Sequence, residues 1–431
     1  MLNASTGHPN SPAAVVPTET TAKGDEFRRS GGVLLAATIG SAGSLTSIGY
    51  YSLGSFIAPL QAEFGWKRGE VASAFLYTTV VLALISPLMG LMIDRLGVRR
   101  MALVSIPALA AVFFALGRFQ GSLASFHLLY ALAAIAGAGT TPISYTRAVN
   151  GAFDKSRGLA LGISQAGIAL AAIGVPLLMA AAIPYGWRAG YSLLAALTLV
   201  PWLFVLVGMR QPASKQAQPV DGPGHTVREA LGTVVFWAVG LSFAAIAVAI
   251  SALVVHLVPL LRDAGVSPMK AAATASFIGV GVLVGRIVGG YLIDRFFAPF
   301  VATTLFMLAA GGCLVLLLGG TDMAIVAAGL MGFALGAEAD LIAYITARYF
   351  GLGRYGVLYS IIYSLFVLGG AIGPTLAGMS FDATGSYNTT LWAVVVVLTC
   401  ASVAIAKLPR FETFASGKAD SRKLPSQPLT P

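Results

Sequence analysis

The sequence predicts an all-α membrane protein with twelve transmembrane helices, arranged as two pseudo-symmetric six-helix bundles. Three observations support this prediction: a low content of charged residues, twelve long apolar runs, and an internal repeat that relates the two halves of the chain. Of the 431 residues, 57% are hydrophobic and only 10% are charged, against roughly a quarter in an average soluble domain. A bilayer accounts for the deficit, because lipid then covers the outer face of the protein.

The charge and cysteine patterns exclude several classes of function. The net charge is +10, but the basic residues lie between apolar runs and form no continuous basic face for a nucleic acid. Cys313 and Cys400 both fall inside apolar runs, without the spacing of a metal site or a disulfide framework. No Ser/His/Asp set or phosphate-binding loop is present. We therefore expect neither an enzyme nor a cofactor.

Twelve apolar runs approach or exceed the length of about 20 residues that a spanning helix needs. They are 33–58, 71–93, 101–117, 126–149, 158–183, 189–209, 231–256, 271–293, 300–319, 324–347, 356–379 and 389–407. A polar segment rich in Pro and Gly separates the sixth run from the seventh, as in a flexible linker. The expected organisation is a disordered tail at 1–30, a bundle at 31–210, a linker at 211–229, a second bundle at 230–408 and a disordered tail at 409–431.

The distribution of Lys and Arg predicts the orientation. With both termini in the cytoplasm, 19 of the 27 basic residues lie in cytoplasmic tails, loops or helix ends, as the positive-inside rule requires. Six lie on the outside: Lys67, Arg68, Arg118, Arg188, Arg262 and Lys270. We expect a multi-pass protein of the cytoplasmic (inner) membrane, with the lipid bilayer as its surroundings, that functions as a monomer.

The two halves resemble each other in sequence. Residues 59–95 align without gaps on 259–295, and the recurring residues include Pro59, Leu60, Gly65, Gly90, Ile93, Asp94 and Arg95. The stretch GAGTTPISYTRA at 137–148 aligns on GAEADLIAYITA at 336–347 and matches Tyr145 with Tyr344. A duplication of this kind predicts a solute site between the halves, near the middle of the membrane.

The loop after the second run carries a recognisable motif. The stretch GLMIDRLGVRR (90–100) resembles the signature of the major facilitator superfamily, and a degenerate copy, GGYLIDRFF, follows the eighth run. The resemblance covers about 31–408 and implies the major facilitator fold. It also implies a cytoplasmic gate, in which the loop residues hold the halves together when the other side is open; the alternative is a topology signal only. The gate residues are Gly90, Asp94, Arg95, Gly97, Arg99, Arg100, Asp294 and Arg295.

Within the superfamily, the chain resembles the monocarboxylate and oxalate/formate porter branch. This resemblance lies in SRGLALGISQAGIALAAIGVPLL (156–178), in GWR (186–188) and in GRIVGGYLIDR (285–295). The chain departs from it at Val282, where monocarboxylate porters often have Asp, and in 356–379, which lacks the Lys of oxalate porters. The resemblance therefore implies a carrier of a small organic anion without naming that anion.

Arg286 lies deep inside the eighth run. It precedes Asp294, at the cytoplasmic edge, by eight residues, which places it roughly 12 Å into the membrane. A charge there costs roughly 2.5–3.5 kcal/mol on insertion, and the repeat has Ser86 at the equivalent position. Since a guanidinium binds a carboxylate bidentately, we expect Arg286 to hold the substrate. The alternative is a structural ion pair with an acid of the tenth run.

Two acids lie inside the tenth run. Glu338 and Asp340 replace Gly139 and Thr141 of the first half. One of them is the candidate for proton coupling, with Asp340 slightly favoured. The alternative role is charge compensation for Arg286 or Arg147.

The remaining candidates are less specific. Arg147 could contact the substrate, although a structural role is favoured. Tyr51, Tyr145 and Tyr344 could each offer a hydroxyl to a carboxylate, although a single tyrosine more often serves in packing. His127 and His256, near the outer ends of their runs, are expected to be interfacial residues.

These features together predict a secondary active transporter that takes up a small organic anion, a monocarboxylate, with a proton by alternating access. The alternatives are an anion exchanger, a drug/proton efflux pump of the same fold, and a transporter-like sensor. A lone deep arginine argues against a pump for lipophilic cations, and the short polar tails argue against a sensor.

Overall fold

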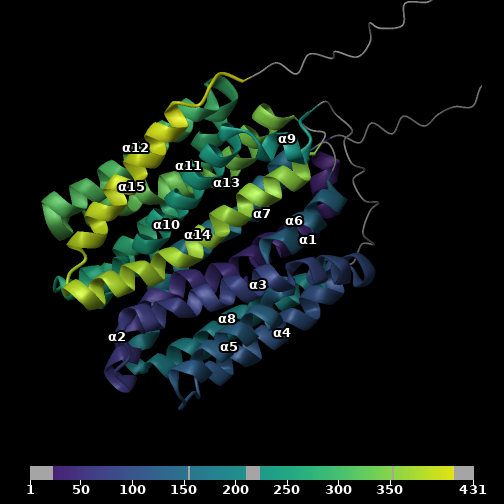
Figure 1. The fold of residues 1–431 in the computed structure, drawn as a ribbon. Coiled ribbons are helices and arrows are strands. Elements are labelled where there is room, and N and C mark those ends of the chain that lie inside the picture. The colour runs from purple at the N-terminus through teal and green to yellow at the C-terminus, as the bar shows by residue number, and fades with distance from the viewer. Residues whose placement is uncertain (1–22, 154–155, 210–223, 352–353, 412–431) are drawn as a thin grey trace, which may run out of the picture.

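A computed structural model of the chain describes residues 23–153, 156–209, 224–351 and 354–411, and within them it is helical throughout (Figure 1). The side chains of residues 23–25, 86, 87, 90, 91, 94, 142, 143, 157 and 158 lie outside the description. The first half holds α1 (Lys23–Ala42), η1 (Leu45–Gly49), α2 (Tyr50–Phe64), α3 (Arg68–Leu96), α4 (Val98–Leu116), α5 (Leu123–Gly137), η2 (Ala138–Thr140), α6 (Pro142–Ala152), α7 (Arg157–Ala182), η3 (Ile183–Tyr185) and α8 (Trp187–Gly208). The second half holds α9 (Val227–Leu231), α10 (Val234–Asp263), α11 (Pro268–Arg295), α12 (Ala298–Gly319), η4 (Gly320–Met323), α13 (Ala324–Phe350), α14 (Tyr355–Thr384) and α15 (Asn388–Ala406).

The described helices account for twelve membrane crossings. Eleven stretches are long and apolar enough to span a bilayer, and one of them, Ala298–Phe350, has 53 residues. That stretch contains two helices, α12 and α13, joined by the short turn η4. Since one crossing needs about 20 residues, it provides two.

Two of the crossings are interrupted, which the apolar pattern does not reveal. The first is divided at Ser44, whose hydroxyl accepts a hydrogen bond from the Ser47 N–H at 3.2 Å. The fourth is divided at Thr141, which has an extended backbone and precedes Pro142. Backbone groups released inside a membrane need internal partners, and the Ser47 hydroxyl supplies one by donating to the Ser41 carbonyl at 2.8 Å.

The helical structure begins before the first predicted bundle. Helix α1 begins at Lys23, inside the segment 1–30 that the sequence assigns to a tail. Phe27 packs on Phe153 with ring centroids 5.3 Å apart, and the Glu26 carboxylate accepts a hydrogen bond from the Ser156 N–H. These contacts hold a polar first turn that hydropathy alone does not predict.

The predicted linker 211–229 falls mostly on residues outside the description, but its end is structured. Helix α9 begins within it, capped by Thr226 and Glu229 in a reciprocal capping box. The Glu229 carboxylate accepts a hydrogen bond from the Thr226 N–H, and this bond lowers the pKa of the Glu229 carboxyl. The expected C-terminal tail likewise begins as packed structure, since Phe411 lies 4.8 Å from the ring of Tyr349.

The two six-helix bundles lie side by side, and α3 of the first half runs against α14 of the second (Figure 1). Helices α7 and α11 form a second contact between the halves, and α2 and α10 a third. Each half has its own apolar core, but Ala169 of α7 packs in the core of the second half and Val255 of α10 in that of the first. The interface is therefore tightly packed around these helices.

The contacts between the halves lie toward one end of the molecule. We call this the distal end. It is formed by the turns at 64–68, 117–123, 183–187, 263–268, 319–324 and 384–388. Both ends of the described chain lie at the opposite end, which we call the proximal end. The Ser276 hydroxyl of α11 donates to the Ile173 carbonyl of α7 at 2.7 Å. A Cβ atom on Gly378 of α14 would lie 2.6 Å from the backbone nitrogen of Gly69 in α3. The halves are therefore closed against each other at the distal end.

Candidate functional site

Closely packed glycines place Arg286 beside the two acids of α13. A Cβ atom on Gly285 would lie 2.0 Å from the Phe333 carbonyl oxygen, and one on Gly336 would lie 2.9 Å from the backbone nitrogen of Arg286. Small residues of this kind let membrane helices approach until their backbones touch. Helix α11 therefore carries Arg286 directly against the segment of α13 that holds Glu338 and Asp340.

Arg286 lies within electrostatic reach of groups from both halves of the molecule. Its charge interacts with Tyr51 of α2, with Tyr363 of α14 and with Asp340 of α13. Among the described residues it forms no ion pair, and its buried Nε has no hydrogen-bond partner. The structural ion pair that was the alternative interpretation of Arg286 is therefore not formed in this conformation.

The two acids have different surroundings. Glu338 is buried, with 1% of its surface exposed, and its Oε1 lacks a hydrogen-bond partner among the described residues. It faces Tyr50, Tyr51 and Tyr363. Asp340 is half-buried and interacts with Arg286 and with Tyr359. Asp340 is thus the acid that shares the electrostatic field of Arg286.

Tyrosines from both halves surround these charges. Tyr50 and Tyr51 pack against each other with ring centroids 5.1 Å apart, and both contact the apolar cores of the two halves. On α14, Tyr359 stacks on Tyr355 at 5.6 Å and on Tyr363 at 5.4 Å. The charged groups therefore lie among aromatic rings and hydroxyl groups, which are typical of pockets for small organic ligands.

Three of the predicted substrate residues lie elsewhere. Tyr145 is fully buried in the core of the first half, where its ring occupies the space beside Gly40 of α1. Arg147 is exposed on α6. Tyr344 is half-buried, with its ring centroid 6.5 Å from that of Phe411. Of the sequence-predicted substrate set, the structure brings only Tyr51 together with Arg286.

The predicted gate residues lie at the proximal end. Gly97 links α3 to α4 with φ of 81°, a left-handed conformation that favours glycine. Arg99 donates to the Leu206 carbonyl at 3.1 Å within its own half. The side chains of Arg95, Arg100, Asp294 and Arg295 are exposed, and Arg295 lies over the ring of Tyr291. Gly90 and Asp94 lie outside the residues whose side chains are described.

A cluster at the distal end was not predicted. Arg68, at the start of α3, donates to the Asp263 carboxylate through Nη1 at 2.5 Å and Nη2 at 3.0 Å. Its guanidinium also lies 3.7 Å from the centroid of the Phe381 ring. The side chain of Arg68 is only 10% exposed and that of Asp263 is 40% exposed. This bidentate pair joins the two halves at the edge of the packed interface.

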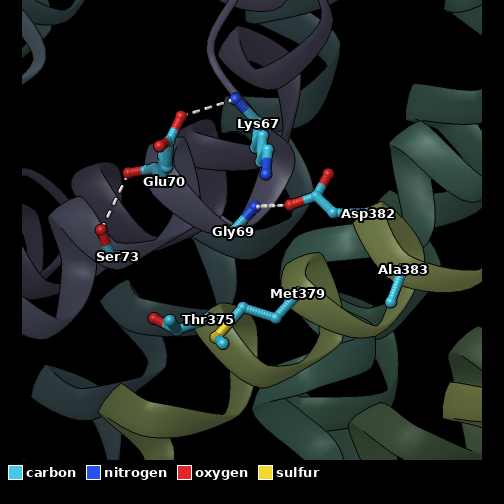
Figure 2. Close-up of a pocket in the computed structure, with 8 residues that line it drawn as sticks. All are labelled: Lys67, Gly69, Glu70, Ser73, Thr375, Met379, Asp382 and Ala383. Atoms are coloured by element: carbon cyan, nitrogen blue, oxygen red, sulfur yellow. Dashed lines mark hydrogen bonds between the residues drawn. The ribbon is translucent and has the colours of Figure 1, made fainter.

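Asp382 of α14 reinforces this contact from the second half. Its carboxylate accepts a hydrogen bond from the backbone N–H group of Arg68 at 2.9 Å. It accepts another from the N–H group of Gly69 at 2.8 Å, which Figure 2 shows. These N–H groups belong to the first turn of α3, where the helix has no partner for them and favours a negative charge. Beside them lies a cavity of about 440 Å³, lined by residues of α3 and α14 that Figure 2 labels.

The cluster extends to two further groups. Tyr387 accepts a hydrogen bond from Arg68 Nη1 at 2.9 Å, and its hydroxyl lies 2.8 Å from Nδ1 of His256. Burial raises the pKa of Tyr387, so the hydroxyl keeps its proton. We call Arg68, Asp263, Asp382, Tyr387 and His256 the distal latch. A sequence signal existed, since Arg68, Asp263 and Asp382 all flank apolar runs on the same side of the membrane.

Among the described residues, no group of three or more His, Cys, Asp or Glu side chains could hold a metal ion.

Comparisons with known proteins agree with this architecture. The profile of the Major Facilitator Superfamily matches residues 39–374. Monocarboxylate transporter 13 of Bos taurus is 25% identical over 88% of this chain and 89% of its own length. Monocarboxylate transporter 11 of Mus musculus is 26% identical over 83% of each chain. The MFS-type transporter YcxA of Bacillus subtilis is 24% identical over 82% of this chain and 89% of its own.

Solved structures share the fold. A bacterial homologue of the human lysosomal transporter Spinster, in an inward-facing and unoccupied conformation, has a TM-score of 0.70 at 18% identity, over 89% of this chain and 97% of that one. The D-xylose–proton symporter has a TM-score of 0.66 at 14% identity, over 88% and 98%. The predicted fold class is confirmed by these similarities.

Proposed function

Since the chain belongs to the Major Facilitator Superfamily, whose members are transporters and not enzymes, we propose that it carries a small monocarboxylate across the cytoplasmic membrane together with a proton. One observation carries the proposal: Arg286 lies between the halves, next to Tyr51 and Tyr363, without an ion-pair partner among the described residues. A guanidinium within a membrane-spanning helix favours a counter-ion, and a substrate carboxylate can provide one in bidentate geometry.

The names of the similar proteins point to the same class of substrate. Monocarboxylate transporters 11 and 13 align with more than four fifths of the chain. A single guanidinium matches one carboxylate, whereas a dianion needs a second cation. This supports a monocarboxylate over a dicarboxylate.

The proposed cycle assigns separate roles to the two acids. Asp340 is the counter-charge of Arg286 when no substrate is bound. A proton on Asp340 removes that charge and leaves the guanidinium for the substrate anion. Glu338 is buried near tyrosines and forms no ion pair among the described residues, so a charged carboxylate there would cost several kcal/mol. It therefore remains protonated through the cycle.

The function is tested by uptake into proteoliposomes. Radiolabelled lactate, pyruvate and benzoate serve as monocarboxylate probes and oxalate as the dicarboxylate, each with and without an inwardly directed proton gradient. Symport predicts that the gradient accelerates monocarboxylate uptake. Equal uptake with and without the gradient would contradict proton coupling and favour an exchanger.

Arg286→Ala tests the anion site. Losing a desolvated charged hydrogen-bond pair costs about 2–4 kcal/mol, so uptake at low substrate concentration falls by about 30-fold or more. Lys270→Ala is the matched control, because it removes an exposed cation from the same helix. Normal uptake by folded Arg286→Ala would refute the proposed role.

A further inference from the structure

We propose that the distal latch is a pH-sensitive gate, which stays closed while His256 is neutral and opens when His256 gains a proton. The proposal concerns the conformational cycle of the proposed carrier. It stands on a continuous hydrogen-bonded chain that crosses from one half of the molecule to the other.

The hydrogen bonds fix the protonation of His256. Its Nε2 lies 2.9 Å from the Pro374 carbonyl oxygen, which can only accept, so Nε2 carries a hydrogen. The Tyr387 oxygen accepts from Arg68, so its own hydrogen is available for Nδ1 of His256. The chain of donors thus runs from Arg68 through Tyr387 and His256 to Pro374. It is complete only with a neutral imidazole.

A second proton on the ring breaks this order. Protonated Nδ1 becomes a donor facing Tyr387, whose hydroxyl hydrogen then loses its acceptor. His256 is fully buried, and a buried polar group without a partner costs roughly 1–3 kcal/mol. The positive charge on the protonated ring is also repelled by the guanidinium of Arg68, which lies on α3. Both effects destabilise the closed contact.

The acids near His256 do not cancel this penalty. The ring interacts with Asp263, at the end of its own helix, and with Asp382 of α14. Asp263 is occupied by the bidentate contact with Arg68, and Asp382 by two N–H groups of α3. The hydrogen bonds of His256 go to Tyr387 and Pro374, so the two acids favour a protonated ring only through their charge, which the guanidinium of Arg68 opposes.

The sign of the pH dependence follows. The closed latch requires the neutral ring, whereas an open latch exposes His256 to water, where histidine ordinarily titrates near about 6.5. Closure is therefore favoured above that range and weakened as the pH falls through it. With the termini in the cytoplasm, the latch faces the outside, so an acidic exterior opens the carrier toward the source of protons.

The experiment measures the distance between the halves without substrate. Spin labels are placed at Gln120 and Asp322, which are exposed in distal turns of the first and second half, after Cys313 and Cys400 are replaced by Ser. Electron–electron resonance distances are recorded from about pH 8 to pH 5.5, across the titration range of histidine. We expect one short distance at the upper pH. At the lower pH a longer population should grow, with an open-to-closed ratio changed by about tenfold.

Variants assign the response to His256. His256→Gln keeps a neutral donor and acceptor and should stay closed at both pH values. His127→Gln is the control, because His127 bonds only to Ser73 and Glu70 within its own half, and it should respond like the parent. A pH-independent parent, an unchanged response in His256→Gln, or an equal loss in His127→Gln would overturn the proposal.

A second variant keeps the test decisive if His256→Gln fails to fold. Tyr387→Phe retains the imidazole but removes the link to Arg68, so the distal end should open more at the upper pH and respond less to acid. Closure and a pH response equal to those of the parent would overturn the proposal. Because no substrate is present, either result leaves the test of Arg286 by uptake independent.

Discussion

At the residue scale, the position of Arg286 gives the molecule its chemical character. Its charge lies within a membrane-spanning helix, and the close contact of α11 with α13 holds it near Asp340. The cost of that charge falls when an anion arrives. In the proposed role of Arg286, this gain goes to guests that carry a negative charge.

Asp340→Asn should separate transport from proton coupling. The amide resembles the protonated acid and leaves Arg286 permanently available, so anion exchange across the membrane persists. Accumulation driven by a proton gradient should fall about tenfold or more, because no group then links the proton to the anion. Counterflow and gradient-driven uptake in the same proteoliposomes measure the two activities.

Glu338→Gln is the matched control for this prediction. If Glu338 remains protonated through the cycle, its amide should keep both activities within about threefold of the parent, a change under 1 kcal/mol. Loss of coupling in Glu338→Gln with normal coupling in Asp340→Asn would reverse the assignment of the two acids.

The sequence identified these residues but not their partners. Arg286, Glu338 and Asp340 stand out because a charge in an apolar run is rare. Repeat symmetry singles out Tyr145 and Tyr344, yet Tyr145 is a core residue and Tyr344 lies beside Phe411. Symmetry in sequence does not report which face of a helix meets the other half. That depends on packing between segments distant in the chain.

At the element scale, glycines determine how closely the halves approach. Gly54 of α2 lies so near α10 that a Cβ atom would be 2.1 Å from the Val255 carbonyl oxygen. Gly378 of α14 makes the equivalent approach to α3 at Gly69. The hydropathy pattern predicted every crossing but no such contact, because glycines facing lipid and glycines facing a helix look alike in sequence. Gly370, for instance, belongs to the same helix but has only an ordinary contact with Ala247.

Gly378→Ala should shift the molecule away from distal closure. The added methyl group must push the backbones of α3 and α14 apart, at a cost of about 1–3 kcal/mol, which lowers the closed population by about fivefold to 150-fold. The spin-label pair at Gln120 and Asp322 measures the shift. Gly370→Ala should leave the distances unchanged. Equal behaviour of the two variants would show that this close approach does not control closure.

At the scale of the whole molecule, the closed distal end and the exposed charges of the proximal end fit the proposed transport cycle. The distal latch joins the halves through Arg68, while Arg95, Arg100, Asp294 and Arg295 of the proximal motif are exposed. The two sets of charges lie at opposite ends of the same bundles. This arrangement is expected of a carrier whose halves rock about a central site, with one end joined at a time.

The latch also explains why sequence alone located the fold better than the gates. Arg68 is one of the six basic residues on the outside, and it therefore reduces the excess of Lys and Arg on the side of the termini. Its partners are 195 residues away at Asp263 and 314 residues away at Asp382. A local pattern contains no information on pairs so distant. Positive charge placed outside against the general bias was the available clue.

The orientation of the whole molecule gives the last prediction. Nineteen of the 27 basic residues lie on the side of the termini, and moving many positive charges outward across the membrane is opposed during insertion. The distal end should therefore face the exterior.

In a background without Cys313 and Cys400, Gln120→Cys at the distal end and Arg228→Cys on α9 at the proximal end place one exposed thiol on each side. A membrane-impermeant maleimide should label the first in intact cells and the second only after permeabilisation. The reverse pattern would place the distal latch in the cytoplasm, and acid outside the cell could then no longer reach His256 to open it.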